Sequence, residues 1–487
     1  MILIVIGVPF LLGLFVLALI MQKQAASYSL WEKLALSFSI GLGLLTVLMY
    51  LLASIKVVLS LPAILVAVAL IIAPICLYLF FAKTFCLTIS EIRSAFNFRD
   101  LKLTWPEIIL IGLIGLKVVH AFFTALVKPM VDIDAFQFYS IVAKGIFYTG
   151  RLFDPYLSQF MSDKPPFPFI AQGWAFIGLG TANDALFKVI TPVMFLCLLV
   201  IFYSALKRYY TRWVCLLFTF LLSSLPLMLY HVGTAYADFP ITFYFSVGTI
   251  YLYLFIKGRA GDGPGRANTD LFAAALLLGI TVWVKRAGLV LVGADLLALA
   301  VYLAIANKTI SRKDWGRICL AILIFALIIL PWISQGQLGT FTRILGSLSG
   351  SKVETALPAA AAAAAMPTGE KAGTMIAIFT KKLFLYGDWQ LTWTLFVCSL
   401  IFFYQRAFRR PLNYLLAMIT LSVMTIFIQF GSGEMFRWLL DGTLFDRLIM
   451  NEVPIVILFC AEAVIPGLTA SFSANESRVS IKNKRGS

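Results

Sequence analysis

Two aspartates open a polar stretch of the chain that could carry out acid–base chemistry. Asp132 and Asp134 follow one hydrophobic block, and the polar stretch continues to Gln172, where the next hydrophobic block begins. A carboxylate at such a place could deprotonate a hydroxyl group and make it a nucleophile. Aspartate is also a favoured N-cap residue, and an aromatic-rich segment with helical spacing follows. Both interpretations, general base and N-cap, fit the pattern.

Basic residues that could hold a phosphate occur at two places. Lys164 precedes two prolines in DKPPFP (163–168), which place a cation on a rigid corner suited to a phosphate leaving group. The alternative is a helix-start corner whose lysine faces lipid headgroups. Lys285 and Arg286 interrupt two apolar runs in WVKRAG, and they suit either a lipid phosphate or simple snorkelling to the interface.

Two further charged residues stand at the mouths of hydrophobic segments. Asp238, in AYADFP, begins such a segment, where an acid is costly unless it is partnered or functional. Arg447 precedes the last hydrophobic segment and could bind a phosphate or pair with its neighbour Asp446. We expect the pairing with Asp446.

The composition is that of a multi-pass membrane protein. Of 487 residues, 61% are hydrophobic and only 13% are charged, and the mean hydropathy is +0.94. The net charge of +16 comes from Lys and Arg clustered in short loops, which is the positive-inside pattern and argues against nucleic-acid binding. Seven scattered cysteines and two histidines argue against a disulfide framework and a zinc site.

Hydropathy predicts an all-α polytopic fold with about thirteen transmembrane helices, since a span needs about 20 apolar residues. The predicted spans are residues 1–21, 30–54, 57–81, 106–127, 183–205, 213–230, 238–256, 269–283, 287–305, 316–334, 386–404, 412–430 and 446–467. The basic loops and the C-terminus then lie on the cytoplasmic side. The acids and bases above therefore share the outer face, and residues 135–147 predict a helix in the interface plane.

The hydrophobic pattern divides the chain into three parts. Residues 1–105 hold N-terminal helices and a basic cytoplasmic loop, residues 106–467 form the catalytic membrane domain, and residues 468–487 are a cytoplasmic tail. Within the membrane domain, residues 128–182 form the catalytic outer loop and residues 335–385 a flexible one. The latter contains a poly-alanine run at 359–365, which is typical of a mobile linker or a lid over substrate.

The order of these motifs resembles the GT-C superfamily of integral-membrane glycosyltransferases. In particular, it is similar to the branch with protein O-mannosyltransferases and the bacterial transferase that adds aminoarabinose to lipid A. The matching elements, in chain order, are Asp134, DKPPF (163–167), ADFP (237–240), VKRAG (284–288) and FDRLIMNEVP (445–454).

This sequence departs from the branch in three respects. Three predicted spans precede the catalytic loop, no soluble C-terminal domain follows, and Ala135 stands where a second acid is common. The extra acid is Asp132, so the resemblance leaves open whether Asp132 or Asp134 is the base.

The resemblance implies a polyprenyl-phosphate-linked sugar donor and an acceptor hydroxyl on a glycan, lipid or protein. Transfer would invert the anomeric centre, with Asp134 as general base and Asp132 or Asp238 orienting the acceptor or sugar. The donor phosphate would be bound by Lys164, Lys285, Arg286 and Arg447. Many such enzymes use no metal where lysines suffice, while others bind a divalent cation (Mg or Mn) through their acids, and the resemblance leaves both open.

The expected location is the bacterial cytoplasmic membrane, with the active site facing the periplasm or exterior. The tail carries no ER-retention signal, and both Asn-x-Ser/Thr sites, Asn307 and Asn475, fall on the cytoplasmic side. The main rival function is a transporter or flippase of a lipid-linked saccharide. The sequence shows no internal repeat, and its large loop lies on one side, which favours the transferase.

Overall fold

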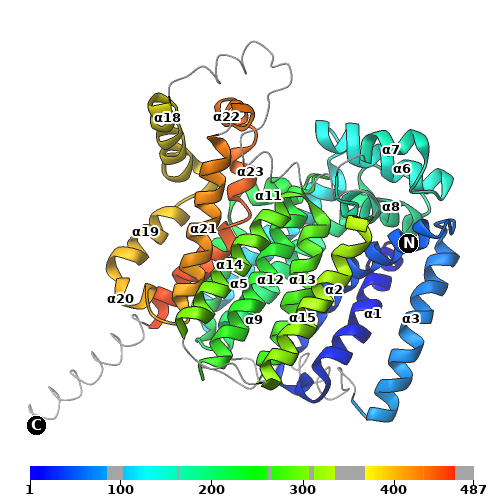
Figure 1. The fold of residues 1–487 in the computed structure, drawn as a ribbon, viewed down its shortest axis with the longest axis horizontal. Helices are drawn as coiled ribbons and strands as arrows, with labels where there is room; N and C mark the ends of the chain where they lie inside the picture. The colour runs from blue at the N-terminus through cyan, green and yellow to red at the C-terminus, as the bar shows by residue number, and fades with distance from the viewer. Residues whose placement is uncertain are drawn as a thin grey trace, which may run out of the picture.

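The computed structural model describes residues 1–84, 102–161, 164–261, 266–306, 312–334, 368–431 and 433–466. Every regular element within these ranges is a helix, and the longer ones run side by side (Figure 1). The long helices are α1 (Ile2–Met21), α2 (Leu30–Ser54), α3 (Leu61–Ala82), α5 (Trp105–Val127), α9 (Ile190–Lys207), α12 (Asp238–Arg259), α13 (Ala267–Val284), α14 (Ala287–Ala306), α15 (Arg312–Trp332) and α21 (Leu412–Phe430).

Local sequence explains where several of these helices begin. The hydroxyl of Ser29 accepts a hydrogen bond from the backbone of Glu32 at the start of α2, and Ser60 does the same for Ala63 at the start of α3. Thr104 and Glu107 form a capping box before α5, where a proline occupies the first turn. The predicted all-α membrane fold is therefore confirmed.

Ten helices in the described ranges are long and apolar enough to cross a membrane, or eleven if one bent pair is a single span. The other predicted spans take different forms. Residues 213–230 form α10 (Arg212–Ser223) and α11 (Pro226–Val232), bent by 69° at a proline that cannot continue the hydrogen-bond ladder. Residues 386–404 contain a 3₁₀ turn (Gly387–Trp389) and the 11-residue helix α19 (Thr392–Phe402), and the last span is the shorter helix Val453–Pro466.

Helix α12 lies at the centre of the bundle, because its membrane-spanning window is 100% buried. Helices α2, α9 and α13 contact it, whereas α3, α5 and α15 lie at the periphery with few of their residues buried. Helices α1 and α2 approach closely at Gly13 and Gly41, where an added Cβ on either glycine would collide with a backbone carbonyl of the other helix. The outer helices therefore present apolar surface for lipid contact.

Short helices gather at both edges of one end of the bundle, and they carry the predicted outer loops (Figure 1). The first group comprises the π-helical turn η3 (Ala135–Tyr139), α6 (Ser140–Thr149), α7 (Pro155–Met161), α8 (Phe167–Leu179) and the 3₁₀ turn η4 (Leu186–Val189). The second comprises α18 (Thr368–Thr380), the π-helical turn η6 (Lys381–Leu385), the 3₁₀ turn η7 (Gly387–Trp389), α22 (Gly433–Leu440) and α23 (Phe445–Ile449).

The other short elements are the 3₁₀ helix η1 (Gln22–Ser27) and α20 (Tyr404–Ala407). The start of the chain lies at the same end as α8, since Trp174 of α8 donates a hydrogen bond to the carbonyl of Val5. Helix α9 ends at Lys207 and α12 at Arg259, so these basic residues lie at the opposite end. The poly-alanine run and the tail 468–487 lie outside the described residues.

Candidate active site

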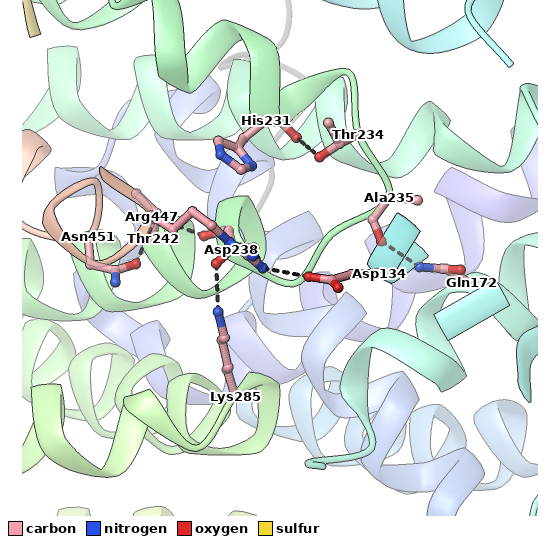
Figure 2. Close-up of polar contacts among 10 residues, drawn as sticks. All are labelled: Asp134, Gln172, His231, Thr234, Ala235, Asp238, Thr242, Lys285, Arg447 and Asn451. Atoms are coloured by element: carbon pink, nitrogen blue, oxygen red, sulfur yellow. Dashed lines mark hydrogen bonds and ion pairs between the residues drawn. The ribbon is translucent and has the colours of Figure 1, made fainter. Parts of the chain in front are cut away.

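The candidate site is built around Asp238, the first residue of α12. Its side chain is 1% exposed and contacts two cations. Lys285 donates from Nζ to Oδ1 at 2.6 Å, and Arg447 donates from Nε and Nη2 to Oδ2 at 3.0 and 2.7 Å (Figure 2). The N-terminus of α12 adds a further favourable partial charge. Asp238 is therefore a fixed anion that holds two basic side chains in place.

Three other elements supply the residues around Asp238. Lys285 lies in the extended junction where α13 ends and α14 begins, and Arg447 lies on α23. Arg447 also reaches Oδ2 of Asp134 through Nη2, at 3.1 Å. Segments distant in sequence thus bring together Asp134, Asp238, Lys285 and Arg447 (Figure 2), which we call the charged cluster.

Asp134 differs from Asp238 in its exposure. The Asp134 side chain is 40% exposed, whereas the side chains of Lys285 and Arg447 are 24% and 22% exposed. Asp134 occupies the N-cap position of η3, yet its side chain makes no capping hydrogen bond. The carboxylate points instead to Arg447, so the N-cap interpretation does not explain this residue.

Asp132 faces a different partner. Its Oδ1 accepts a hydrogen bond from the hydroxyl of Tyr230 at 3.0 Å, and Tyr230 belongs to α11. Its backbone carbonyl accepts from the amide of Phe136, which starts the η3 turn. The structure thus separates the two candidate bases by their contacts, since Asp134 contacts the charged cluster and Asp132 contacts α11.

Lys164 lies against aromatic rings. Its Nζ is 3.4 Å from the ring centroid of Phe138 and 5.6 Å from that of Tyr139, both within cation–π range. Lys164 also lines a cavity of about 370 Å³ whose walls include Tyr50, Phe153 and Trp332. The lining also includes Asp154 and Ser158 but is mostly apolar, and a cation beside such a cavity is suited to an anionic group that carries an apolar chain.

Tyr139 lies between Lys164 and the charged cluster. Burial, followed by the negative charge of Asp238, raises the pKa of Tyr139 above its ordinary value, so its phenol stays protonated near neutral pH. Burial lowers the pKa of Arg447, but Asp238 and Asp134 outweigh that effect and raise it above its ordinary value. Arg447 is therefore a permanent cation, and Tyr139 is unsuited to act as a base.

One predicted pairing is wrong. Arg447 contacts Asp238 and Asp134 rather than its neighbour Asp446, which pairs with Lys382 of η6. Consecutive residues on a helix point about 100° apart, so Asp446 and Arg447 face different surroundings. Arg286 lies beside Lys285 in the same junction and is partly buried.

Two polar residues that support the site, Lys188 and Gln172, carried no clear signal in the sequence. Lys188, at the start of the α9 segment, donates to the backbone carbonyls of Lys128 and Gly233, and so ties together the two loops that precede the acids. Gln172 of α8 donates to the carbonyl of Ala235 at 2.9 Å. A lysine beside an apolar run resembles an ordinary interfacial residue, so only the fold reveals the role of Lys188.

Two of the acids near the site already accept hydrogen bonds from basic or phenolic groups. Among the described residues, no group of three or more His, Cys, Asp or Glu is placed to hold a metal ion. Both oxygens of Asp238 are taken by Lys285 and Arg447, and Asp132 accepts from Tyr230. Asp238 therefore has no free carboxylate oxygen to share with a divalent cation.

Comparison with known proteins finds a family-model match that agrees with the mannosyltransferase side of the resemblance. The family model described as dolichyl-phosphate-mannose-protein mannosyltransferase matches residues 157–342. A crystal structure of ArnT from Cupriavidus metallidurans in the apo state aligns with a TM-score of 0.49 and 14% identity, covering 72% of this chain and 59% of that one. This chain therefore spans less than two thirds of the length of that protein. No curated protein matches the chain.

Proposed function

We propose that the chain is an integral-membrane glycosyltransferase that takes its sugar from a lipid-phosphate-linked donor. The observation that carries the proposal is the charged cluster, in which an accessible carboxylate lies beside two cations that a buried aspartate holds in place. The match of the mannosyltransferase model to residues 157–342 supports the same reaction class. The donor would be a polyprenyl-phosphate sugar and the acceptor a hydroxyl of a glycan, lipid or protein.

In this mechanism, Asp134 takes the proton of the acceptor hydroxyl. The acceptor oxygen bonds to the anomeric carbon from the face opposite the phosphate, while the bond from that carbon to the phosphate oxygen breaks. The configuration is therefore inverted in one displacement. Asp134 is the suitable base because it is exposed to an acceptor, whereas Asp238 is buried with both oxygens engaged.

The basic side chains would stabilise the departing lipid phosphate, which leaves with the electron pair of the broken bond. Arg447 and Lys285 carry more N–H groups than Asp238 and Asp134 accept, so both can donate to phosphate oxygens as well. Lys164, at the wall of its cavity, would approach the phosphate from the other side. Because lysine and arginine supply the positive charge, the mechanism needs no divalent cation.

The multi-pass character follows from the ten apolar helices, and we propose a bacterial cytoplasmic membrane with the charged cluster on its outer face. The test is transfer of label from radiolabelled polyprenyl-phosphate sugars to a membrane lipid, glycan or protein extract by the purified chain. We expect a labelled product with inverted configuration and free lipid phosphate. The proposal fails if the chain binds donors but never releases lipid phosphate, and movement of donor across proteoliposomes would instead identify a transporter.

The matched control for an Asp→Asn substitution in the charged cluster is Asp184→Asn. Asp184 lies near the same end of the bundle and pairs with Lys144 at 2.8 Å, but its side chain is 44% exposed and lies outside the charged cluster. We expect this variant to transfer sugar at the wild-type rate. Lys164→Ala should bind donor at least ~10-fold more weakly, since a hydrogen bond to a charged group is worth about 1.5 kcal/mol or more.

A further inference from the structure

A second cavity lies at the end of the bundle opposite the charged cluster. It has a volume of about 610 Å³ and is bounded by α2, α5, α9 and α10. Arg266, which lines it, precedes α13, whereas Lys285 of the charged cluster follows that helix. At about 1.5 Å per residue, the two positions are separated by roughly 28 Å along the axis. The cavity is therefore distinct from the candidate active site.

One end of this cavity is basic. Lys207, Arg208 and Arg266 line it, and Glu32 is the one carboxylate among its described lining residues. Arg208 is held by Glu32 at 2.6 Å and by Asp270, which lies behind the cavity, at 2.9 Å. These ion pairs fix the guanidinium in place but leave the lining with an excess of positive charge.

Two buried donors at this end lack an acceptor. The Nε groups of Arg208 and Arg266 are buried and make no hydrogen bond within the described ranges of the chain. Both guanidinium groups stack on Tyr28, with their central carbons 5.1 and 4.9 Å from the ring centroid. A buried N–H without an acceptor is unfavourable, so these two guanidinium groups keep donor capacity that no described residue uses.

The rest of the cavity is apolar and reaches along α9 toward the membrane interior. Leu196 and Lys207 both line it and lie about 16 Å apart along that helix, at 1.5 Å rise per residue. Leu196 and Trp31 are 39% and 46% exposed, so the cavity opens on the side of the bundle that faces lipid. A ligand with an anionic head and a long apolar chain fits this shape and polarity.

We propose that this cavity is a binding site for an anionic phospholipid of the leaflet at the basic end of the bundle. The phosphodiester oxygens accept from Arg208, Arg266 and Lys207, and one acyl chain lies along α9 toward Leu196. An anionic headgroup is preferred over choline, because a quaternary ammonium would add positive charge where the lining already has an excess. The site goes beyond the proposed transferase activity and does not depend on it.

The experiment measures quenching of Trp31 fluorescence by phospholipids with brominated acyl chains. The chain has 10 tryptophans, so the Trp31 signal is taken as the difference between the full chain and its Trp31→Phe variant in a non-ionic detergent. Brominated phosphatidylglycerol and phosphatidylcholine are titrated separately. We expect phosphatidylglycerol to quench the Trp31 signal with a midpoint ~10-fold lower than that of phosphatidylcholine.

One variant changes the basic end of the cavity, a second fills its apolar part, and a third is a control outside the cavity. Combining Lys207→Gln with Arg266→Gln should raise the phosphatidylglycerol midpoint ~10-fold or more and remove the preference over phosphatidylcholine. Val200→Phe should fill the apolar part without adding a tryptophan, and it should abolish quenching by both lipids. Arg259→Gln changes a basic residue at the same end that does not line the cavity, and it should leave both midpoints unchanged.

Three results would overturn the proposal. Equal quenching by the two lipids, unaffected by the double substitution, would mean nonspecific contact with the apolar surface. No quenching by either lipid in the correctly folded wild type would mean that the cavity is not open to phospholipid. Displacement of brominated phosphatidylglycerol by a tenfold lower concentration of polyprenyl phosphate would assign the cavity to a carrier lipid instead.

Discussion

Asp238 should be energetically coupled to Lys285, because the two side chains lie 2.6 Å apart and Asp238 is 1% exposed. The charged cluster contains two acids and two bases, so its formal charge is zero. Asp238→Asn leaves a net charge of +1, and Lys285→Met leaves −1. The double variant restores neutrality. Its loss in free energy of unfolding should therefore be smaller than the sum of the losses of the two single variants.

The expected losses in free energy of unfolding follow from the burial of these side chains. Removing one partner of a buried ion pair costs about 3 kcal/mol or more, and Asp238→Asn should lie near that value because Lys285 and Arg447 keep some solvent contact. Lys285→Met should cost about 1.5 kcal/mol, since Arg447 still neutralises Asp238. If the coupling is about 2 kcal/mol, the double variant should lose roughly 2.5 kcal/mol rather than 4.5.

The assay is unfolding of the purified chain in mixed detergent micelles with increasing mole fraction of sodium dodecyl sulfate, followed by helical circular dichroism. A distant pair provides the control. Asp238→Asn combined with Lys144→Met, which disturbs the exposed pair with Asp184, should be additive within about 0.5 kcal/mol. If the double variant Asp238→Asn with Lys285→Met instead loses as much free energy of unfolding as the two single variants together, the ion-pair account of the charged cluster is refuted.

Three further predictions concern the supports of the site and its metal dependence. Lys188→Met should lower transfer activity and speed hydrogen exchange in residues 231–237, because the carbonyl of Gly233 loses its donor, and unchanged exchange would contradict this role. Lys382→Met should leave Asp446 buried without its cation and destabilise the chain by about 2 kcal/mol, whereas Lys371→Met, nearby on α18, should have little effect in the same unfolding assay. Chelation with EDTA should leave the transfer rate unchanged, and loss of activity restored by Mg²⁺ or Mn²⁺ would show that the acids do bind a metal.

Hydropathy alone predicts most of this fold, because crossing a bilayer requires long apolar helices and the chain supplies them. Hydropathy fails where the length and direction of a helix depend on local backbone chemistry. The run at 213–230 is apolar enough for one span, but Pro226 removes a backbone donor and the helix bends there. Sequence averages over a window do not register such a bend.

The site was partly predictable for a similar reason. Asp134, Asp238, Lys285 and Arg447 stand out because charge is rare beside apolar spans, and the fold brings all four together. The ion-pair partners of Arg447 were not predictable. It contacts Asp134 and Asp238, which lie more than 200 positions away, rather than its sequence neighbour Asp446. These contacts depend on Arg447 of α23 lying beside the first residue of α12, which no local pattern encodes.

The central claim is that Asp134 removes the acceptor proton, and comparison of Asp134→Asn with Asp132→Asn tests it most directly. Donor binding and single-turnover transfer should be measured separately for both variants. We predict that Asp134→Asn binds donor but loses transfer by at least ~100-fold, the usual contribution of a general base, while Asp132→Asn keeps most of the rate. Full transfer by Asp134→Asn, or its loss in Asp132→Asn alone, would contradict the assignment.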